Sequence, residues 1–415
     1  MRLLGPLRER DFALLWTGSV VSMLGDGIFI VALPFAVLDR SDSAATLSLV
    51  GLAWSLGMVG FLLVGGVLAD RTDKRRVLIL GDVIRLAALA VAATLSLAGA
   101  LDLWELILLA ACYGVGEGLS APAMGAIVPE LVPEPVLLPA NALYGASRPL
   151  ALRLAGPALG GLVVGLAGTS GAFLVDAVTF VLSIACLVAI RTRPRALPEA
   201  EPLRAQLREA ARFVRSQTWL WATLVGAAVS LLAFMGPVEV LLPFRVKEEL
   251  GSTAAAFGLV LAAGGAGSAL GSLLVGHFGT PRAQVTFLYW MWGLSMIGLC
   301  GYGLAQSVWQ LVLCGVVYGV FGGAGNPVWT TLMQVRVPPG LRGRVGSLDW
   351  LVSVGLTPVS FALTGPLAAA FGAQATLVAA GAVAAVVTIG LLYLVPGLRD
   401  DQPRSSAATS SANVG

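Results

Sequence analysis

Charged residues are scarce in this chain. They make up 12% of its 415 residues, against 57% for apolar residues. A soluble globular domain carries about 25% charged residues, so there is too little charge here to cover a surface that faces water. Histidine is nearly absent, with one residue, and the net charge is only +3. These shortages exclude a soluble enzyme, a nucleic-acid-binding protein and a disordered chain, and they leave a polytopic membrane protein.

Cysteine is rare as well. The four cysteines stand inside apolar runs with no CxxC spacing, which predicts small packing residues rather than a disulfide or metal framework. We therefore expect no cofactor and no metal site. The first apolar run lacks a small-residue cleavage site behind a short apolar core, so it is expected to be a retained span and not a signal peptide.

Twelve apolar runs are long enough to cross a bilayer as helices, which takes about 20 residues each. They cover residues 12–38, 46–69, 77–99, 103–128, 137–168 and 170–190, and then 219–244, 253–278, 284–305, 307–335, 344–371 and 373–395. The sequence thus predicts an all-α polytopic membrane protein with twelve transmembrane helices. Its predicted parts are a six-helix bundle at 1–190, a cytoplasmic linker at 191–218, a second six-helix bundle at 219–396 and a disordered cytoplasmic tail at 397–415.

Lysine and arginine collect on one side of these spans. If the N-terminus lies inside, the inner segments carry 20 basic residues and the outer loops carry three. Such a bias marks the cytoplasmic side, so we expect both termini in the cytoplasm and the chain in the inner membrane of a bacterial cell. Four arginines of the linker recur at helical spacing, which predicts an amphipathic helix lying against anionic lipid. They are Arg204, Arg208, Arg212 and Arg215.

The two halves repeat one another in sequence. Gly156-Pro157 in the fifth span matches Gly365-Pro366 in the eleventh at an offset of 209 residues, and Gly51-Leu52 matches Gly258-Leu259 at an offset of 207. Because both halves begin inside and contain six spans, the repeat is parallel, with its axis along the membrane normal. Repeats of this kind place a substrate site near the bilayer midplane between the halves, which favours a transporter over a channel.

The loop after the second span reads Gly66-Val67-Leu68-Ala69-Asp70-Arg71-Thr72-Asp73-Lys74-Arg75-Arg76. It resembles the hallmark loop of the major facilitator superfamily, G-x-L-x-D-R-x-G-R-R, with Asp73 in place of the glycine. The resemblance implies the major facilitator fold and a cytoplasmic gating loop. An acid among basic residues can form charge-assisted hydrogen bonds that hold the cytoplasmic side in one state, whereas anchoring at the membrane explains the basic residues alone. The implied gating residues are Gly66, Asp70, Arg71, Arg75 and Arg76.

The fifth span contains Gly156, Pro157, Gly160 and Gly161. This pattern resembles the G-P-x-x-G-G core of a motif associated with antiporters in the same superfamily, although the usual preceding glycine is Leu152 here. Glycine permits close approach of helices and proline frees a backbone carbonyl, so the resemblance implies an antiporter-type hinge. General packing of small residues is the alternative.

Other motifs narrow the resemblance to one branch of the superfamily. Arg10-Asp11-Phe12, Gly25-Asp26-Gly27, residues 128–142 and Arg342-Gly343-Arg344 are similar to bacterial exporters of macrolides, tetracycline-like drugs and enterobactin. The resemblance covers residues 8 to about 397 and implies export without indicating the substrate. The fourth span departs from the drug-antiporter pattern, because Ala110 stands where those proteins usually have an arginine.

Charged side chains inside the spans are candidates for function, because a charge in the bilayer is costly. Asp26 and Glu239 occupy the first and seventh spans, which the repeat relates, and Glu117 and Arg148 lie on spans that could bring them together. A desolvated carboxylate is driven toward its neutral form, so these acids could exchange protons and couple them to substrate. Structural ion pairing is the alternative for each.

The remaining polar candidates have expected structural roles. Asp82 and Arg85 are spaced i, i+3, which predicts an ion pair near the cytoplasmic interface, and Asp176 lies close enough to the outer edge to reach water. Asn326, Trp329 and Trp54 could add polar and aromatic surface to a cavity, or could simply pack.

Together these features predict a secondary active exporter. We expect a proton antiporter that moves hydrophobic or amphipathic small molecules by alternating access, since carriers of sugars or phosphates need more hydrogen-bonding or basic groups. Its expected partners are the substrate, protons and membrane lipids, with no nucleic acid, and a monomer is expected. A metabolite uptake symporter or uniporter is one alternative, and a non-transporting receptor or scaffold is another.

Overall fold

A computed structural model describes residues 5–191, 203–279, 282–338 and 341–399. Within these ranges all regular secondary structure is helical. The predicted tail from residue 400 onward and part of the predicted linker, residues 192–202, lie outside the described residues.

The first six spans form one group of helices, which a short 3-10 helix, η1 (Gly5–Arg8), precedes. The first four spans are one helix each, whereas the fifth consists of α5, a π-helical turn η2 and the start of α6, which continues as the sixth span. These elements are α1 (Arg10–Leu38), α2 (Ala44–Arg71), α3 (Lys74–Leu97), α4 (Leu103–Leu131), α5 (Glu134–Pro149), η2 (Leu150–Ala155) and α6 (Gly156–Ala189).

The last six spans form the second group. Helix α7 (Leu203–Ser216) precedes them within the predicted linker, and its Glu209 forms an ion pair with Arg344. The eleventh span is divided between α12 and α13 at Leu356, two residues before Pro358. The elements are α8 (Thr218–Phe244), η3 (Arg245–Glu249), α9 (Ala254–Phe278), α10 (Gln284–Leu304), α11 (Val308–Arg336), α12 (Arg342–Gly355), α13 (Thr357–Phe371) and α14 (Ala373–Leu394).

The prediction of twelve spans is confirmed. Among the described residues eleven helical stretches are long and apolar enough to cross a membrane, and one of them, Pro135–Ala189, has 55 residues. At about 1.5 Å per residue that stretch is long enough to cross a bilayer of roughly 30 Å twice. Gly168, with φ of 68°, breaks the helix between the two crossings, so it contains both the fifth and the sixth span.

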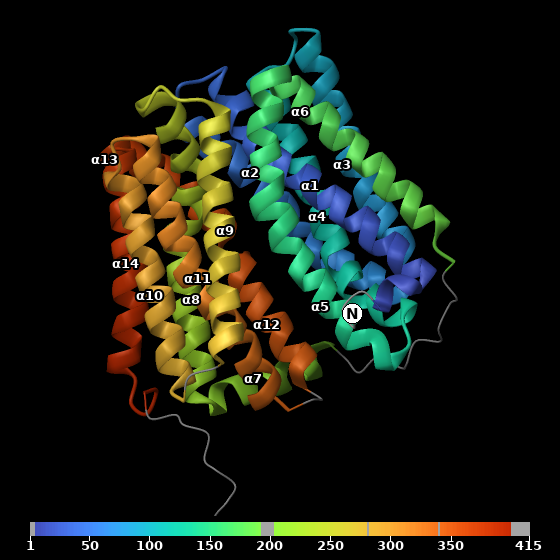
Figure 1. The fold of residues 1–415 in the computed structure, drawn as a ribbon, viewed down its shortest axis with the longest axis vertical. Helices are drawn as coiled ribbons and strands as arrows, with labels where there is room; N and C mark the ends of the chain where they lie inside the picture. The colour runs from blue at the N-terminus through green and yellow to red at the C-terminus, as the bar shows by residue number, and fades with distance from the viewer. Residues whose placement is uncertain (1–4, 192–202, 280–281, 339–340, 400–415) are drawn as a thin grey trace, which may run out of the picture.

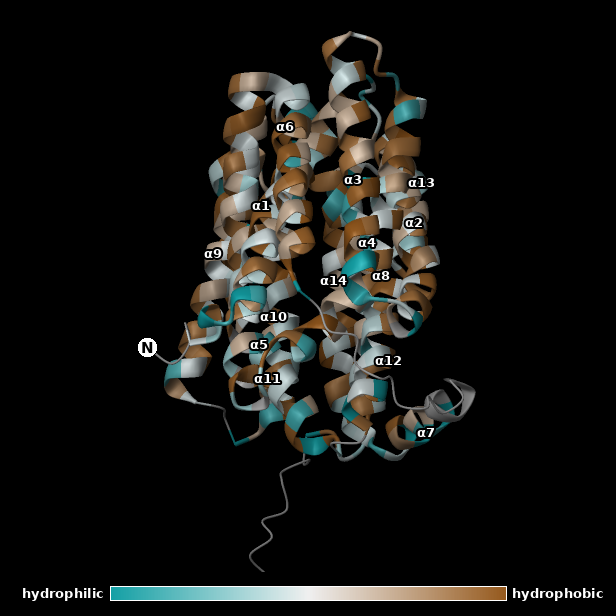
Figure 2. Ribbon diagram, turned by 90° about the vertical axis from the view of Figure 1, so that its right-hand side faces the viewer, coloured by the Kyte–Doolittle hydropathy of each residue, from teal (hydrophilic) through white to brown (hydrophobic). Residues whose placement is uncertain are grey.

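The two groups of helices stand side by side as two halves (Figure 1). One end of the molecule carries the N-terminus, α7 and the loop between α2 and α3, and we call it the arginine-rich end. The halves meet near the opposite end, where α13 packs on α2 and α9 packs on α6 and η2. They diverge toward the arginine-rich end, where α12 packs on α7, α8 and α11 of its own half. Figure 2 shows apolar residues along the helices and hydrophilic residues concentrated at the end that carries α7.

Repeat-related glycines take part in two of the contacts between the halves. A Cβ atom added to Gly258 of α9 would lie 2.4 Å from the carbonyl oxygen of Pro157, and one added to Gly51 of α2 would lie 2.2 Å from the ring of Phe361. Both distances are shorter than normal Cβ contacts, so a side chain at either position would force the opposite helix or ring to shift. The internal repeat of the sequence therefore corresponds to two equivalent contacts in the structure.

Candidate functional site

A cluster of charged residues lies inside the first half, where α1, α3, α4 and α6 pack together. Its centre is Arg85 of α3, whose stem fits against Gly116 of α4. A Cβ atom at position 116 would lie 2.7 Å from Cγ of Arg85, so the glycine leaves room for the arginine. The guanidinium lies over the ring of Phe180, 4.4 Å from its centroid, and such cation–π contacts are stronger where water is excluded.

The predicted ion pair between Asp82 and Arg85 is confirmed. Nη2 of Arg85 lies 2.6 Å from Oδ1 of Asp82, and the hydroxyl of Ser183 donates to Oδ2 at 2.7 Å. Both charged side chains are buried. The pair is also joined to Asp26, because Arg85 contacts that carboxylate as well. The sequence could not show this, since the contact depends on how α1 and α3 are rotated against each other.

Asp26 connects the buried cluster to the space outside it. Its carboxylate lies 3.5 Å from Nη1 of Arg85, and its side chain retains 22% of its exposure. The hydroxyl of Tyr113 on α4 donates to the same carboxylate oxygen, and the tyrosine ring stacks on Phe29 with centroids 4.1 Å apart. Asp26 thus contacts a cation and a hydroxyl while part of it stays accessible.

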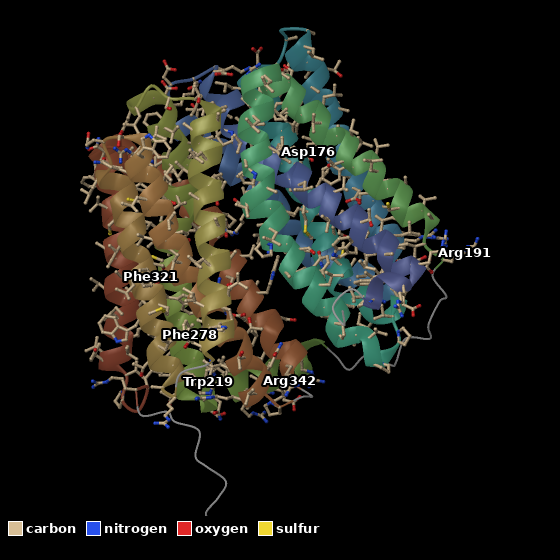
Figure 3. All side chains as sticks on the ribbon, viewed as in Figure 1. Asp176, Arg191, Trp219, Phe278, Phe321 and Arg342 are labelled. Atoms are coloured by element: carbon tan, nitrogen blue, oxygen red, sulfur yellow. The ribbon has the colours of Figure 1, made fainter. Side chains whose placement is uncertain are left out.

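Asp176 is buried completely, which corrects the expectation that it reaches water at the edge of the membrane. It lies eight residues beyond the break at Gly168, or about 12 Å along the helix, and it faces α1. A Cβ atom at Gly25 would lie 2.0 Å from its Oδ1. Figure 3 shows Asp176 inside the first half, while Arg191, beyond the end of the same helix, lies at its rim.

The expected pairing of Glu117 with Arg148 is not formed among the described residues. Glu117 instead accepts a hydrogen bond from Nε1 of Trp54 at 3.1 Å. Arg148 has an exposed side chain and lies within electrostatic reach of Asp26 and Glu117 without a direct contact. The ring of Trp54 lies edge-on to that of Phe361 in the other half, with centroids 6.1 Å apart. Trp54 therefore links Glu117 to the contact between the halves.

Glu239 stands apart from this cluster. It projects from α8 in the second half with an exposed side chain, and it lies within electrostatic reach of Arg153 on η2 and of Tyr318 on α11. An acid of the second half therefore lies within electrostatic reach of a basic residue of the first. The repeat predicted related helices for Asp26 and Glu239, and the structure places the two acids in different surroundings.

Of the three cavity candidates, Trp329 belongs to a cluster of tryptophans in the second half. Its ring centroid lies 6.0 Å from those of both Trp219 and Trp292. Its Nε1 donates to Asp349 at 3.2 Å, while Nε1 of Trp292 donates to the exposed Asn326 at 3.2 Å. Trp219 lies near the arginine-rich end (Figure 3). Asp349 was not singled out from the sequence, although an acid inside a predicted span is a signal that could have found it.

The loop between α2 and α3 forms its described contacts within the first half. Asp73 caps α3 by accepting from the backbone nitrogen of Arg75 at 2.9 Å. Its φ of −62° is an ordinary value, so the glycine usual at this position is not needed here. Lys74 lies 2.6 Å from Glu130 of α4, and Arg75 donates to the carbonyl of Ile190 at the end of α6.

The other residues of the implied gating loop have fewer contacts. Arg71 and Arg76 are exposed, and a Cβ atom at Gly66 would meet nothing within 4 Å. Asp70 lies in α2, and its side chain is outside the described part of the structure. A role for this loop in gating stays a prediction.

The glycines of the implied hinge are packing positions on two sides. Gly156 and Gly160 face α1, where added Cβ atoms would lie 2.7 Å from Cα of Gly27 and 2.9 Å from Cα of Ile28. Gly161 faces α9 of the other half, at 2.8 Å from Cα of Ala255. Pro157 contacts the same helix through its carbonyl. This segment therefore joins the first half to the second, and the π-helical turn η2 precedes it directly.

The fold and the buried charges of these twelve spans are those of a membrane transporter. The chain belongs to the family described as transmembrane secretion effectors of the major facilitator superfamily, whose profile matches residues 2–414. It is a multi-pass membrane protein and not an enzyme.

Named relatives and solved structures agree with this family. The chain is 28% identical over 406 residues to the multidrug efflux pump Tap of Mycolicibacterium fortuitum, covering 95% of this chain and 97% of the pump. It is 24% identical to macrolide efflux protein A of Streptococcus pyogenes, covering 85% and 88%. A bacterial homologue of the iron transporter ferroportin, solved in an inward-facing state, shares the fold with a TM-score of 0.69 at 19% identity, covering 92% of this chain and 98% of that one.

Proposed function

We propose that this protein is a secondary active exporter that exchanges protons for hydrophobic or amphipathic drugs across a bacterial inner membrane. The observation that carries the proposal is Asp26. It is partly exposed, and it is joined through Arg85 and Tyr113 to charges buried inside the first half. A carboxylate in this position can exchange protons with water and transmit its charge state to the packing of α1, α3 and α4.

The arrangement of the halves supports alternating access. The halves touch near one end through glycine contacts and diverge toward the arginine-rich end. We propose that the arginine-rich end faces the cytoplasm, because basic residues concentrate on that side of bacterial membranes. The described conformation would then be open to the cytoplasm, ready to take up a drug. Both termini would be cytoplasmic, and reporter fusions at residue 415 test this orientation.

The proposed substrate class follows from the relatives and from the side chains. The relatives are named for multidrug and macrolide efflux, and the acids Asp26, Glu117 and Glu239 are accompanied by tryptophan and tyrosine rings. Aromatic faces and carboxylates attract bulky organic cations. We propose that the transporter acts as a monomer with protons, substrate and lipid as its partners.

The test is drug transport in inverted membrane vesicles. A pH gradient should drive uptake of ethidium or erythromycin by the wild type, and Asp26→Asn or Glu239→Gln should abolish that driven uptake. Asp42→Asn, which changes an exposed acid of the outer loop, is the matched control and should transport normally. If uptake driven by the pH gradient persisted in both single variants and in the double variant, the proposed coupling to protons would be wrong. Counterflow in the uptake direction would favour a symporter, and flux no greater than that of empty liposomes would favour a receptor.

A further inference from the structure

Among the described residues, Asp176 is the acid of the buried cluster that forms no ion pair with an arginine or a lysine. Its side chain is 0% exposed. Oδ1 accepts a hydrogen bond from the hydroxyl of Thr179 at 3.1 Å, while Oδ2 has no hydrogen-bond partner. A buried carboxylate with one unsatisfied oxygen is costly if it is ionised, and the cost falls if the carboxyl group is protonated.

The ionisable groups that face Asp176 do not compensate a negative charge on its carboxylate. They are Asp26 on α1, Arg85 with its partner Asp82 on α3, and Tyr113 on α4. Arg85 lies 2.6 Å from Asp82 and 3.5 Å from Asp26, so its charge is already shared by two acids.

The surplus of acid extends beyond these groups. With Glu117 and Arg148 included, four acids stand against two arginines. If all four were ionised, the middle of the first half would hold uncompensated negative charge in a low-dielectric interior, where such charge is energetically costly.

We propose that Asp176 holds the transported proton and that Asp26 is the carboxylate that passes this proton to water. The carboxyl group of Asp176 packs against the backbone of Gly25, the neighbour of Asp26 in the chain. In the transfer, the O–H bond on Asp176 breaks as one forms on Asp26, which then gives its own proton to water. No other bond changes. The transport part of this inference rests on the proposed exchange of protons for drug.

Arg85 gives the transfer a structural consequence. When Asp26 is ionised, Arg85 is attracted to it across 3.5 Å, and when Asp26 is protonated, Asp82 is the one acid that still forms an ion pair with Arg85 among the described residues. Because Arg85 lies on α3 and Asp26 on α1, the location of the proton changes the attraction between these helices.

The first experiment needs no drug. Infrared spectra of the purified wild type at neutral pH should contain the C=O stretching band of a protonated carboxyl group. Asp176→Asn should remove that band, whereas Asp26→Asn and the control Thr179→Val, which keeps the carboxyl group and loses its hydrogen bond, should retain it. Absence of the band from the wild type, its persistence in Asp176→Asn, or its loss in Asp26→Asn would each overturn the proposal.

The second experiment tests the transport role. In vesicles, Asp176→Asn should lose drug uptake driven by a pH gradient by at least tenfold and keep ethidium transport down its own gradient. The control Asp42→Asn, at an exposed acid outside the cluster, should retain both. Driven uptake at the wild-type level in Asp176→Asn would show that the proton is structural and would overturn the storage role. A wild type without driven uptake would instead overturn the proposed proton exchange, while the infrared band would still report whether Asp176 holds a proton.

Discussion

Ser48 of α2 and Gly365 of α13 join the two halves by a hydrogen bond. The backbone nitrogen of Gly365 donates to the hydroxyl oxygen of Ser48 at 3.1 Å, and this hydroxyl donates to the carbonyl of Phe361. Both residues are buried. The contact between the halves is therefore a specific, buried interface near the end opposite the arginine-rich end.

Replacing Gly51 by valine should prevent the two halves from closing at this interface. The new Cβ atom would overlap the ring of Phe361 at 2.2 Å, and overpacking of this kind costs about 1–3 kcal/mol. We expect the equilibrium to move toward a state open at that end, measured as greater labelling of a cysteine introduced in place of the buried Ser48. Gly60→Val is the control on the same helix, because a Cβ atom there meets nothing within 4 Å. Equal labelling in the two variants would contradict this account of the interface.

The ion pair between Lys247 and Asp39 should stabilise the same closed end. Nζ of Lys247 lies 2.7 Å from the carboxylate of Asp39 across the halves, and the side chain of Asp39 is 52% exposed. An exposed pair contributes about 0.2–1 kcal/mol. Lys247→Asp should therefore increase opening about 1.4- to 5-fold, measured by spin-label distances, and adding Asp39→Lys should restore the wild-type distribution. Failure of the double reversal to restore it would argue against a direct pairing.

Arg75 should stabilise the first half, whereas its neighbour Arg76 should not. The guanidinium of Arg75 donates to the carbonyl of Ile190, beyond the end of α6, where a positive charge also complements the helix dipole. Arg75→Ala should lower the free energy of unfolding by about 1–2 kcal/mol, and the exposed Arg76 should tolerate alanine. Thermal unfolding in detergent measures both, and similar melting temperatures for the two variants would refute the role of this bond.

Asp82 and Asp26 should differ in their effects on stability. Asp82 is buried and binds both Arg85 and Ser183, so Asp82→Ala leaves a buried arginine with one weak partner and should cost about 3–5 kcal/mol. Asp26→Asn keeps the shape of the side chain at a partly exposed position and should cost less than about 1 kcal/mol. Unfolding midpoints of the purified variants provide the measurement. A stable Asp82→Ala variant would mean that Arg85 finds another partner.

Much of the fold could be predicted because a membrane-spanning helix is marked by composition alone. Runs of about 20 apolar residues with polar ends fixed all twelve spans to within a few residues. The boundary between the fifth and sixth spans was also placed correctly, since Gly168 adopts a φ of 68° that favours glycine. The replacement of a glycine by Asp73 was harmless because the loop uses ordinary dihedral angles.

The candidate site was harder to predict because it depends on contacts between helices. Asp82 and Arg85 could be paired from their spacing within one helix, but the link from Arg85 to Asp26 requires the rotation of α1 against α3. Asp176 was misjudged because distance from the end of a span does not show which way a side chain faces. Glu117 and Arg148 have opposite charges, yet the carboxylate of Glu117 accepts a hydrogen bond from the indole nitrogen of Trp54 instead.

The π-helical turn η2 determines how the side chains after it in the fifth span are oriented relative to those before it. In an α-helix, successive residues are about 100° apart around the axis, and a π-turn inserts an extra residue into that count. The residues after η2 are therefore rotated about the helix axis relative to the residues before it. Gly156, Gly160 and Gly161 all follow η2, so this rotation sets how their two surfaces, one toward α1 and one toward the other half, are oriented relative to α5. Removing one residue between 150 and 155 would leave the composition of the span almost unchanged and would misalign both of its glycine surfaces at once.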